Sequence, residues 1–296
     1  MSSTYTSSTF KGIGCMCLGV LCLALGDALT KWLGETHSPL QIIFLRTLVS
    51  LPLIALIAHF NGGLRTLATR RPGVHLLRGL IFAATMICFM WGLTLLPLAE
   101  ATAIAFSAPL FVTLLSVPLL GERVDRPTLL ATALGFVGVL VVVRPGGESF
   151  QPAALVVVAA AVFYALMMIT ARRYGGREHL WAMVFYMTLV PLVVSAGTMP
   201  WVWQTPAPWH WPAFLVAGFL VVVAMTGLTL AFRYAPAALA APFDYTSMLW
   251  AVLLGWWFWD EVPDLWVFVG GTLIITSGLV IAYHEGRTAL KRRPTS

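Results

Sequence analysis

The chain has 296 residues, of which 59% are hydrophobic and only 10% are charged, and its net charge is +6. A typical soluble domain is about 45–50% apolar and about 25% charged, so this composition excludes a soluble enzyme, a disordered chain and a protein whose basic surface binds nucleic acid. It fits a polytopic membrane protein whose function lies inside the bilayer, because ten helices of about 20 residues leave little chain for anything else.

Long apolar stretches separated by short polar breaks predict ten membrane-spanning helices and an all-α fold. The breaks contain glycine, proline and charged residues, which end helices. In chain order the expected spans cover residues 10–33, 39–60, 73–95, 97–119, 126–143, 152–172, 179–200, 210–233, 237–258 and 264–283.

Lysine and arginine are distributed unequally over the loops between these spans. Fifteen of them lie in one alternating set of loops and tails, two (Lys31 and Arg144) lie in the other set, and Arg46 lies inside a span. Because cytoplasmic loops carry the excess of basic residues, both termini are predicted to be cytoplasmic. Nine of the twelve tryptophans fall near the opposite face, as in an aromatic belt at a membrane interface.

The two halves of the chain resemble each other. Pro97 and Glu122 recur as Pro236 and Glu261, both at an offset of 139 (236 − 97 and 261 − 122). Each half holds five spans, which assigns residues 1–147 to one repeat and residues 148–296 to the other. Because five is odd, the second copy must be inverted relative to the first. Inverted repeats are typical of alternating-access transporters, whose substrates bind near the midplane between the halves.

Charged residues inside the spans are candidates for function, because an intramembrane charge is costly. A rise of about 1.5 Å per residue puts Asp27 and Arg46 at similar depths, and Lys31 lies one turn above Asp27. These three residues are expected to form either an outer gate or ion-coupling site, or a structural ion pair that fixes the packing of the first two helices. The structural interpretation is favoured, because a matched pair is tolerated without titration.

Asp244 lies at a comparable depth from the other side of the membrane, with Arg172 and Arg233 as partners within reach. It is expected to be the inner counterpart of the first charged group. Pro109 and Pro242 lie in corresponding helices of the two halves. Each frees a backbone carbonyl and is expected to form either a hinge or a static kink.

Side chains near the midplane predict a substrate site that is mostly apolar with a few polar anchors. Hydroxyl groups are suited to the ammonium or carboxylate of a substrate, and aromatic or thioether groups to its apolar part. Ordinary packing between helices is the competing interpretation for any one of them. The candidates are Met86, Phe89, Ser107, Tyr164, Tyr245, Thr246 and Ser247.

The ten spans, the five-helix halves and a short set of motif residues resemble the drug/metabolite transporter superfamily, in particular its ten-helix EamA-type exporters. In the second copy, Asp260 stands where Gly121 would repeat. Within the superfamily the chain is most similar to the YddG-type aromatic amino-acid exporters. This resemblance implies an inner-membrane protein of bacteria that exports Trp, Phe or Tyr from the cytoplasm. The motif residues are Pro97, Glu122, Gly135 and Gly138 in the first copy and Pro236 and Glu261 in the second.

Other functions would require features of their own in the sequence. The sequence contains no phosphate-binding loop and no zinc-protease motif, and neither enzyme activity, a metal nor a cofactor is expected. A multidrug or quaternary-cation exporter would need a deep, unpaired carboxylate, and a lipid-linked sugar translocase would need a cavity that is open to lipid and charged for phosphate. The expected partners are a small-molecule substrate, namely an amino acid, and the lipid bilayer, with no nucleic acid.

Overall fold

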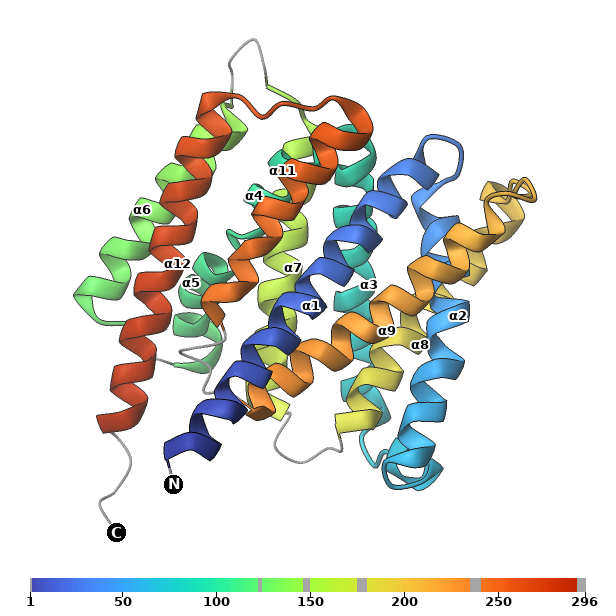
Figure 1. Ribbon diagram of the computed structural model, residues 1–296, viewed down its shortest axis with the longest axis horizontal. Coiled ribbons are helices and arrows are strands. Elements are labelled where there is room, and N and C mark those ends of the chain that lie inside the picture. The colour runs from blue at the N-terminus through green and yellow to red at the C-terminus, as the bar shows by residue number, and fades with distance from the viewer. Residues whose placement is uncertain (1, 122–123, 146–149, 175–179, 235–240, 292–296) are drawn as a thin grey trace.

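A computed structural model describes residues 2–121, 124–145, 150–174, 180–234 and 241–291 of the protein (Figure 1). These residues form helices and contain no strand. The elements are α1 (Ser2–Gly34), α2 (Pro39–Phe60), η1 (Leu64–Leu67), α3 (Pro72–Leu95), α4 (Leu98–Ala105), α5 (Ala108–Leu120), α6 (Arg126–Val143), α7 (Ala153–Tyr174), α8 (Leu180–Val202), α9 (Trp211–Tyr234), η3 (Ala241–Tyr245), α11 (Thr246–Trp259) and α12 (Leu265–Lys291).

Most of these helices can cross a bilayer. Within the described part of the chain, nine stretches are long and apolar enough to do so, and α4 and α5 together make up one of them, at Leu98–Leu120. The helix α11 has 14 residues and, together with η3, occupies the position of the ninth predicted span. The protein is therefore an all-helical integral membrane protein with ten spans, as its hydropathy pattern predicts.

The fourth span is broken near its middle. The sequence predicts one helix over residues 97–119, but Phe106 and Ser107 separate two helices, α4 and α5. Pro109 has no N–H to donate to the carbonyl of Ala105, four residues earlier, so the helical hydrogen-bond ladder is interrupted at this point. The ninth span is divided in the same manner into η3 and α11.

The helices pack according to a two-fold pattern. Each contact of α1 with the second half is matched by a contact of α7, its equivalent, with the first half. Thus α1 packs on α9 and α11, and α7 packs on α3 and α5. The equivalent helices α2 and α8 pack on each other, as do α6 and α12 (Figure 1). Gln41 at the start of α2 donates to the carbonyl of Gln204 just after α8 (2.6 Å), and its side-chain oxygen accepts from the Gln204 N–H (2.9 Å). The start of α2 thus lies beside the end of its counterpart, and the two five-helix halves are inverted relative to each other.

Glycines allow the closest of these contacts. A Cβ atom added at Gly138 of α6 would lie 2.8 Å from the carbonyl oxygen of Gly270 in α12, and one added at Gly270 would lie 2.6 Å from the carbonyl oxygen of Gly138. About two helical turns away from this crossing, Ser277 donates to the carbonyl of Ala131 (2.5 Å). Small residues and interhelical hydrogen bonds are what hold helices together where lipid supplies no hydrophobic drive.

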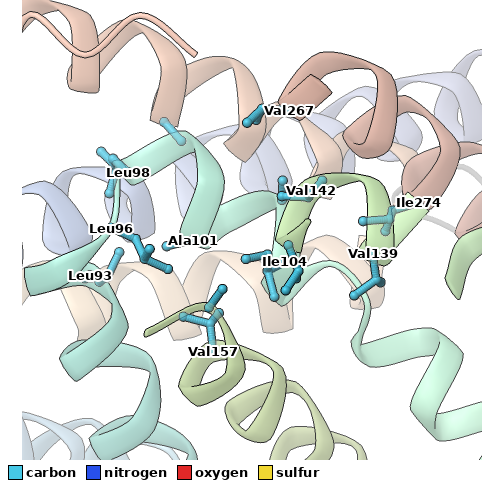
Figure 2. Packing of buried hydrophobic residues seen from close by; sticks show 14 of the residues in the cluster. Leu93, Leu96, Leu98, Ala101, Ile104, Val139, Val142, Val157, Val267 and Ile274 are labelled. Atoms are coloured by element: carbon cyan, nitrogen blue, oxygen red, sulfur yellow. The ribbon is translucent and has the colours of Figure 1, made fainter. Parts of the chain in front are cut away.

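The main apolar cluster joins both halves at one end of the bundle. We call the end where α1 stops and α4 starts the closed end, and the end that holds the first residues of α1 and the last turns of α12 the terminal end (Figure 1). Side chains from the end of α3, from α4, from the end of α6 and from the starts of α7 and α12 converge there (Figure 2). They include Leu93, Leu96, Leu98, Ala101, Ile104, Val139, Val142, Val157, Val267 and Ile274.

Candidate substrate path and gate

An ion pair between the halves lies at the closed end. Lys31 Nζ is 2.6 Å from Glu261 Oε1, and the two side chains are 10% and 21% exposed. Lys31 also donates to the carbonyl of Leu96 (2.6 Å). The expectation that Lys31 joins Asp27 is wrong, because the inverted repeat brings Glu261 from the end of the ninth span to the end of the first.

Glu261 also binds the start of the fourth span. Its Oε2 accepts from the N–H of Leu98, the first residue of α4 (2.9 Å). A carboxylate is stabilised at a helix N-terminus, where the N–H groups lack helical partners. Glu261, which the sequence marks only as a repeated motif residue, therefore ties α1 and α4 of the first half to α11 of the second.

Two further contacts surround this ion pair. The Lys31 Nζ lies 5.5 Å from the centre of the Trp259 ring, a distance suited to a cation–π interaction. The Trp259 Nε1 donates to Glu35 Oε1 (2.9 Å). Neither Trp259 nor Glu35 stands out in the sequence, because one resembles any interfacial tryptophan and the other any loop carboxylate.

Nearby, Arg144 at the end of α6 pairs with Asp264 just before α12, at 2.6 Å. This contact again joins a first-half residue to a second-half residue. The charges at the closed end therefore act between the halves, which is where a gate between two moving bodies would have to act.

The breaks in the fourth and ninth spans lie against each other. The rings of Phe106, between α4 and α5, and Tyr245, at the end of η3, have centroids 5.0 Å apart and are tilted by 56°. The Tyr245 hydroxyl lies over Gly278 of α12, where an added Cβ would collide with it unless the tyrosine moved. Pro109 and η3, which contains Pro242, flank these breaks, so both proposed hinge positions lie at interruptions of a helix.

The hydroxyl groups proposed as substrate anchors bond to their own helices. Ser107 donates to the carbonyl of Ile104 (2.6 Å), Thr246 to Phe243 (2.6 Å) and Ser247 to Asp244 (2.9 Å). Ser107 is fully buried, whereas Thr246 and Ser247 are half-buried. In this conformation each hydroxyl proton is donated to a backbone carbonyl, so these oxygens can serve a substrate only as hydrogen-bond acceptors.

Tyr164, Tyr245 and Asp244 form a second group. The Asp244 carboxylate acts electrostatically on both tyrosine hydroxyls. Asp244 is exposed, and Tyr164 on α7 is 41% exposed. An acidic and an aromatic side chain that are both accessible thus lie within electrostatic range of each other. Asp244 is about 22 Å along the helix from the end of α11, far from the closed end.

The other two midplane candidates are placed apart from this group. Phe89 packs against the main apolar cluster. Met86 is buried with Ile43 of α2 and Met90. Outside the described residues lie Glu122 and Pro236, and the side chains of Arg172, Arg233 and Pro242 are likewise not described.

Asp27 and Arg46 attract each other electrostatically, but the predicted ion pair does not form. No N–O distance of 4.0 Å or less joins them, in contrast to Lys31 and Glu261, whose N–O distance is 2.6 Å. Arg46 is only 8% exposed, and its buried Nε has no hydrogen-bond partner among the described residues. Depth alone suggested the pairing, and depth does not fix the rotation of a helix about its own axis.

Comparison with known proteins places this architecture in a family. The EamA-like transporter family matches the chain twice, over residues 10–144 and 151–283. The chain is 31% identical over 286 residues to a protein of Rickettsia conorii named S-adenosylmethionine uptake transporter, covering 96% of each chain. It is 30% identical over 260 residues to the pseudopaline exporter CntI of Pseudomonas aeruginosa, covering 86% of this chain and 90% of the relative.

One solved structure, titled only as the crystal structure of a protein, has the same fold. Its TM-score is 0.62, its sequence identity is 23%, and the match covers 98% of this chain and 99% of the other. The named relatives move different compounds, so they do not identify the substrate. The broken fourth and ninth spans, the inverted halves and the double family match lead to one assignment: the chain belongs to the EamA-like transporter family and is a multi-pass membrane transporter.

Proposed function

We propose that this transporter moves small metabolites that combine an α-amino-acid group with an aromatic ring system, by alternating access between its two halves. The aromatic amino acids Trp, Phe and Tyr, expected from the sequence, have this chemistry. So does S-adenosylmethionine, the compound in the name of the Rickettsia relatives, which carries an amino-acid group and an adenine ring. The proposal therefore rests on what these two kinds of substrate share.

One observation carries the proposal: the bundle is sealed at one end and accessible beyond its middle. At the closed end, Lys31 and Glu261 are largely buried and lie beside the main apolar cluster. Towards the terminal end, Tyr164 and Asp244 remain accessible and lie within electrostatic range of each other. A site that is open on one side and sealed on the other is what alternating access requires.

The charge bias of the loops gives this arrangement a direction. If basic loops are cytoplasmic, the terminal end faces the cytoplasm and the sealed end faces outward. The conformation then suits loading from the cytoplasm, and we propose export across a bacterial plasma membrane. Residues 1–147 and 148–296 would move as the two bodies, with the breaks at Phe106 and Tyr245 between them.

A second candidate, an organic-cation exporter, is favoured by Asp244. This exposed carboxylate lies within electrostatic range of the Tyr164 and Tyr245 hydroxyls. Aromatic faces and a carboxylate together bind ammonium and sulfonium groups. The same group would also accept the sulfonium centre of S-adenosylmethionine, so this observation supports both candidates and the cargo must be measured.

The test is counterflow in proteoliposomes that contain the purified protein, with protein-free liposomes as the control. Labelled Trp, labelled S-adenosylmethionine and a quaternary ammonium cation without an amino-acid group would be compared. Saturable counterflow of Trp or S-adenosylmethionine supports the proposal. Movement of the simple cation alone would favour the cation exporter. No movement of any of the three would refute the proposed substrate class.

A further inference from the structure

Arg46 is a buried charge that makes no ion pair with a described residue. It lies on α2, is 8% exposed, and its Nε is buried without a hydrogen bond to any described residue. No ion pair joins its guanidinium to a described carboxylate within 4.0 Å. Since an unpaired intramembrane charge is costly, such a residue marks a functional site unless something else compensates it.

Asp27 is the complementary charge. It lies on α1, is half-buried, and is within electrostatic range of Arg46. Lys31, one turn further along α1, does not neutralise it, because Lys31 binds Glu261 and the carbonyl of Leu96. The structure thus holds one negative and one positive group on adjacent helices, close enough to interact and too far apart to pair directly.

Two separated opposite charges match a ligand that carries both charges itself. Resting on the proposed function, we infer that Asp27 and Arg46 together receive the zwitterionic head of an α-amino acid, with the ammonium on Asp27 and the carboxylate on Arg46. The planar guanidinium can bind a carboxylate with two parallel hydrogen bonds. Each charge of the ligand then compensates a charge of the protein, which offsets the cost of desolvating all four groups.

The surroundings of Arg46 suit the rest of such a ligand. Ile43, one turn earlier on α2, packs with Met86 and Met90 of α3, so an apolar wall of thioether and aliphatic groups lies beside Arg46. The site is also one helical turn below the Lys31–Glu261 ion pair. That pair, which is formed in this structure, would shield the bound head from the closed-end solution.

The first test needs no variant. Trp, tryptamine (which lacks the carboxylate) and indole-3-propionate (which lacks the ammonium) would compete with labelled Trp for the purified wild-type protein. For S-adenosylmethionine, the decarboxylated compound serves as the analogue without the carboxylate. We expect each missing charge to weaken binding about tenfold, the value of one charge-assisted hydrogen bond. Analogues that compete as well as the parent compound would overturn the inference.

The second test assigns each charge to its residue. Asp27→Asn should remove the preference for Trp over indole-3-propionate and keep the preference over tryptamine, and Arg46→Gln should do the reverse. Arg65→Gln, at an exposed arginine of η1, is the matched control and should keep both preferences. Equal weakening of all three compounds by both variants would show that the pair is structural only.

The outcomes separate this inference from the proposed function. If the wild-type protein binds neither Trp nor S-adenosylmethionine, the proposed substrate class fails and this assignment fails with it. If it binds and transports one of them but does not discriminate against the analogues, the proposed function stands and the Asp27–Arg46 site is wrong. Variants that do not fold leave the wild-type competition as the deciding measurement.

Discussion

Phe106 and Tyr245 occupy equivalent positions in the two repeats, and their rings contact each other. They are 139 residues apart (245 − 106), the same offset as Pro97 and Pro236, and their centroids are 5.0 Å apart. The next residues, Ser107 and Thr246, each donate a 2.6 Å hydrogen bond to the carbonyl three residues earlier. The axis that relates the halves therefore passes between these two rings, at the break of each helix.

If Tyr245 and Tyr164 line the substrate path, their loss should affect transport of large substrates more than transport of small ones. Tyr164→Ala or Tyr245→Ala should lower counterflow of Trp by roughly five- to tenfold, the value of a lost aromatic contact, and should affect Thr much less. Tyr→Phe at either position keeps the ring and is the matched control. If the Ala variants lower Trp and Thr counterflow equally while both remain folded, these tyrosines do not line the path of the substrate.

The ion pair at the closed end predicts that the stability of the protein depends strongly on both Lys31 and Glu261. Glu261→Gln strands the Lys31 ammonium and should cost about 3 kcal/mol of stability in detergent. It should also make a cysteine introduced at Leu96, which is buried beside the ion pair, more reactive to a thiol reagent. Glu35→Gln removes only the charge of an exposed acceptor, because its amide oxygen can still accept from Trp259, and should cost less than 1 kcal/mol, at the scale of a surface interaction. Equal effects of the two variants would argue against the gate.

The glycine contact between α6 and α12 predicts a steric effect. Gly138→Ala places a Cβ 2.8 Å from the Gly270 carbonyl oxygen, and overpacking of this kind costs about 1–3 kcal/mol. Gly197→Ala is the matched control, because a Cβ there meets no atom within 4 Å and alanine favours the helix by up to about 1 kcal/mol. Thermal unfolding of both variants would check this, and a neutral Gly138→Ala would contradict the close approach of these helices.

The orientation of the chain can be checked by labelling. In a protein without its four native cysteines, a cysteine placed at Ala68 should react from the cytoplasmic side and one placed at Pro208 from the other side. Both positions are exposed and lie at opposite ends of the bundle. Labelling from the same side of intact vesicles would refute the predicted orientation.

His37 predicts a pH effect on stability. It lies between α1 and α2, and burial together with the neighbouring His210 lowers the pKa of His37 below its ordinary value of 6.5. The unfolded chain then binds more protons than the folded one at acidic pH, so stability falls as the pH drops through 6.5. The unfolding temperature should fall less for His37→Gln than for wild type between pH 7.5 and 5.5, while His59→Gln, at an exposed histidine, should behave like wild type.

Much of the architecture follows from the sequence. The ten spans follow from apolar length, because a bilayer of fixed thickness demands it, and the inversion of the halves follows from five spans per repeat. The backbone conformation is also repeated at positions where the residues of the two halves differ. Gly121 and Asp260, which are 139 residues apart, both adopt left-handed backbone at the end of a helix, with φ of 69° and 52°, because Asp tolerates this conformation better than most residues.

Only the tertiary structure decided which charges meet. Hydropathy and depth placed Asp27, Lys31 and Arg46 together, yet Lys31 pairs with Glu261, 230 residues away (261 − 31), and Asp27 and Arg46 remain apart. Depth is a local property that counts residues along a helix. Contact depends instead on the rotation of each helix about its axis and on which helix of the other half packs beside it. For α1 they are fixed by close packing at glycines such as Gly19 and Gly227, where α1 meets α9, and the chain brings these together only when both halves have folded.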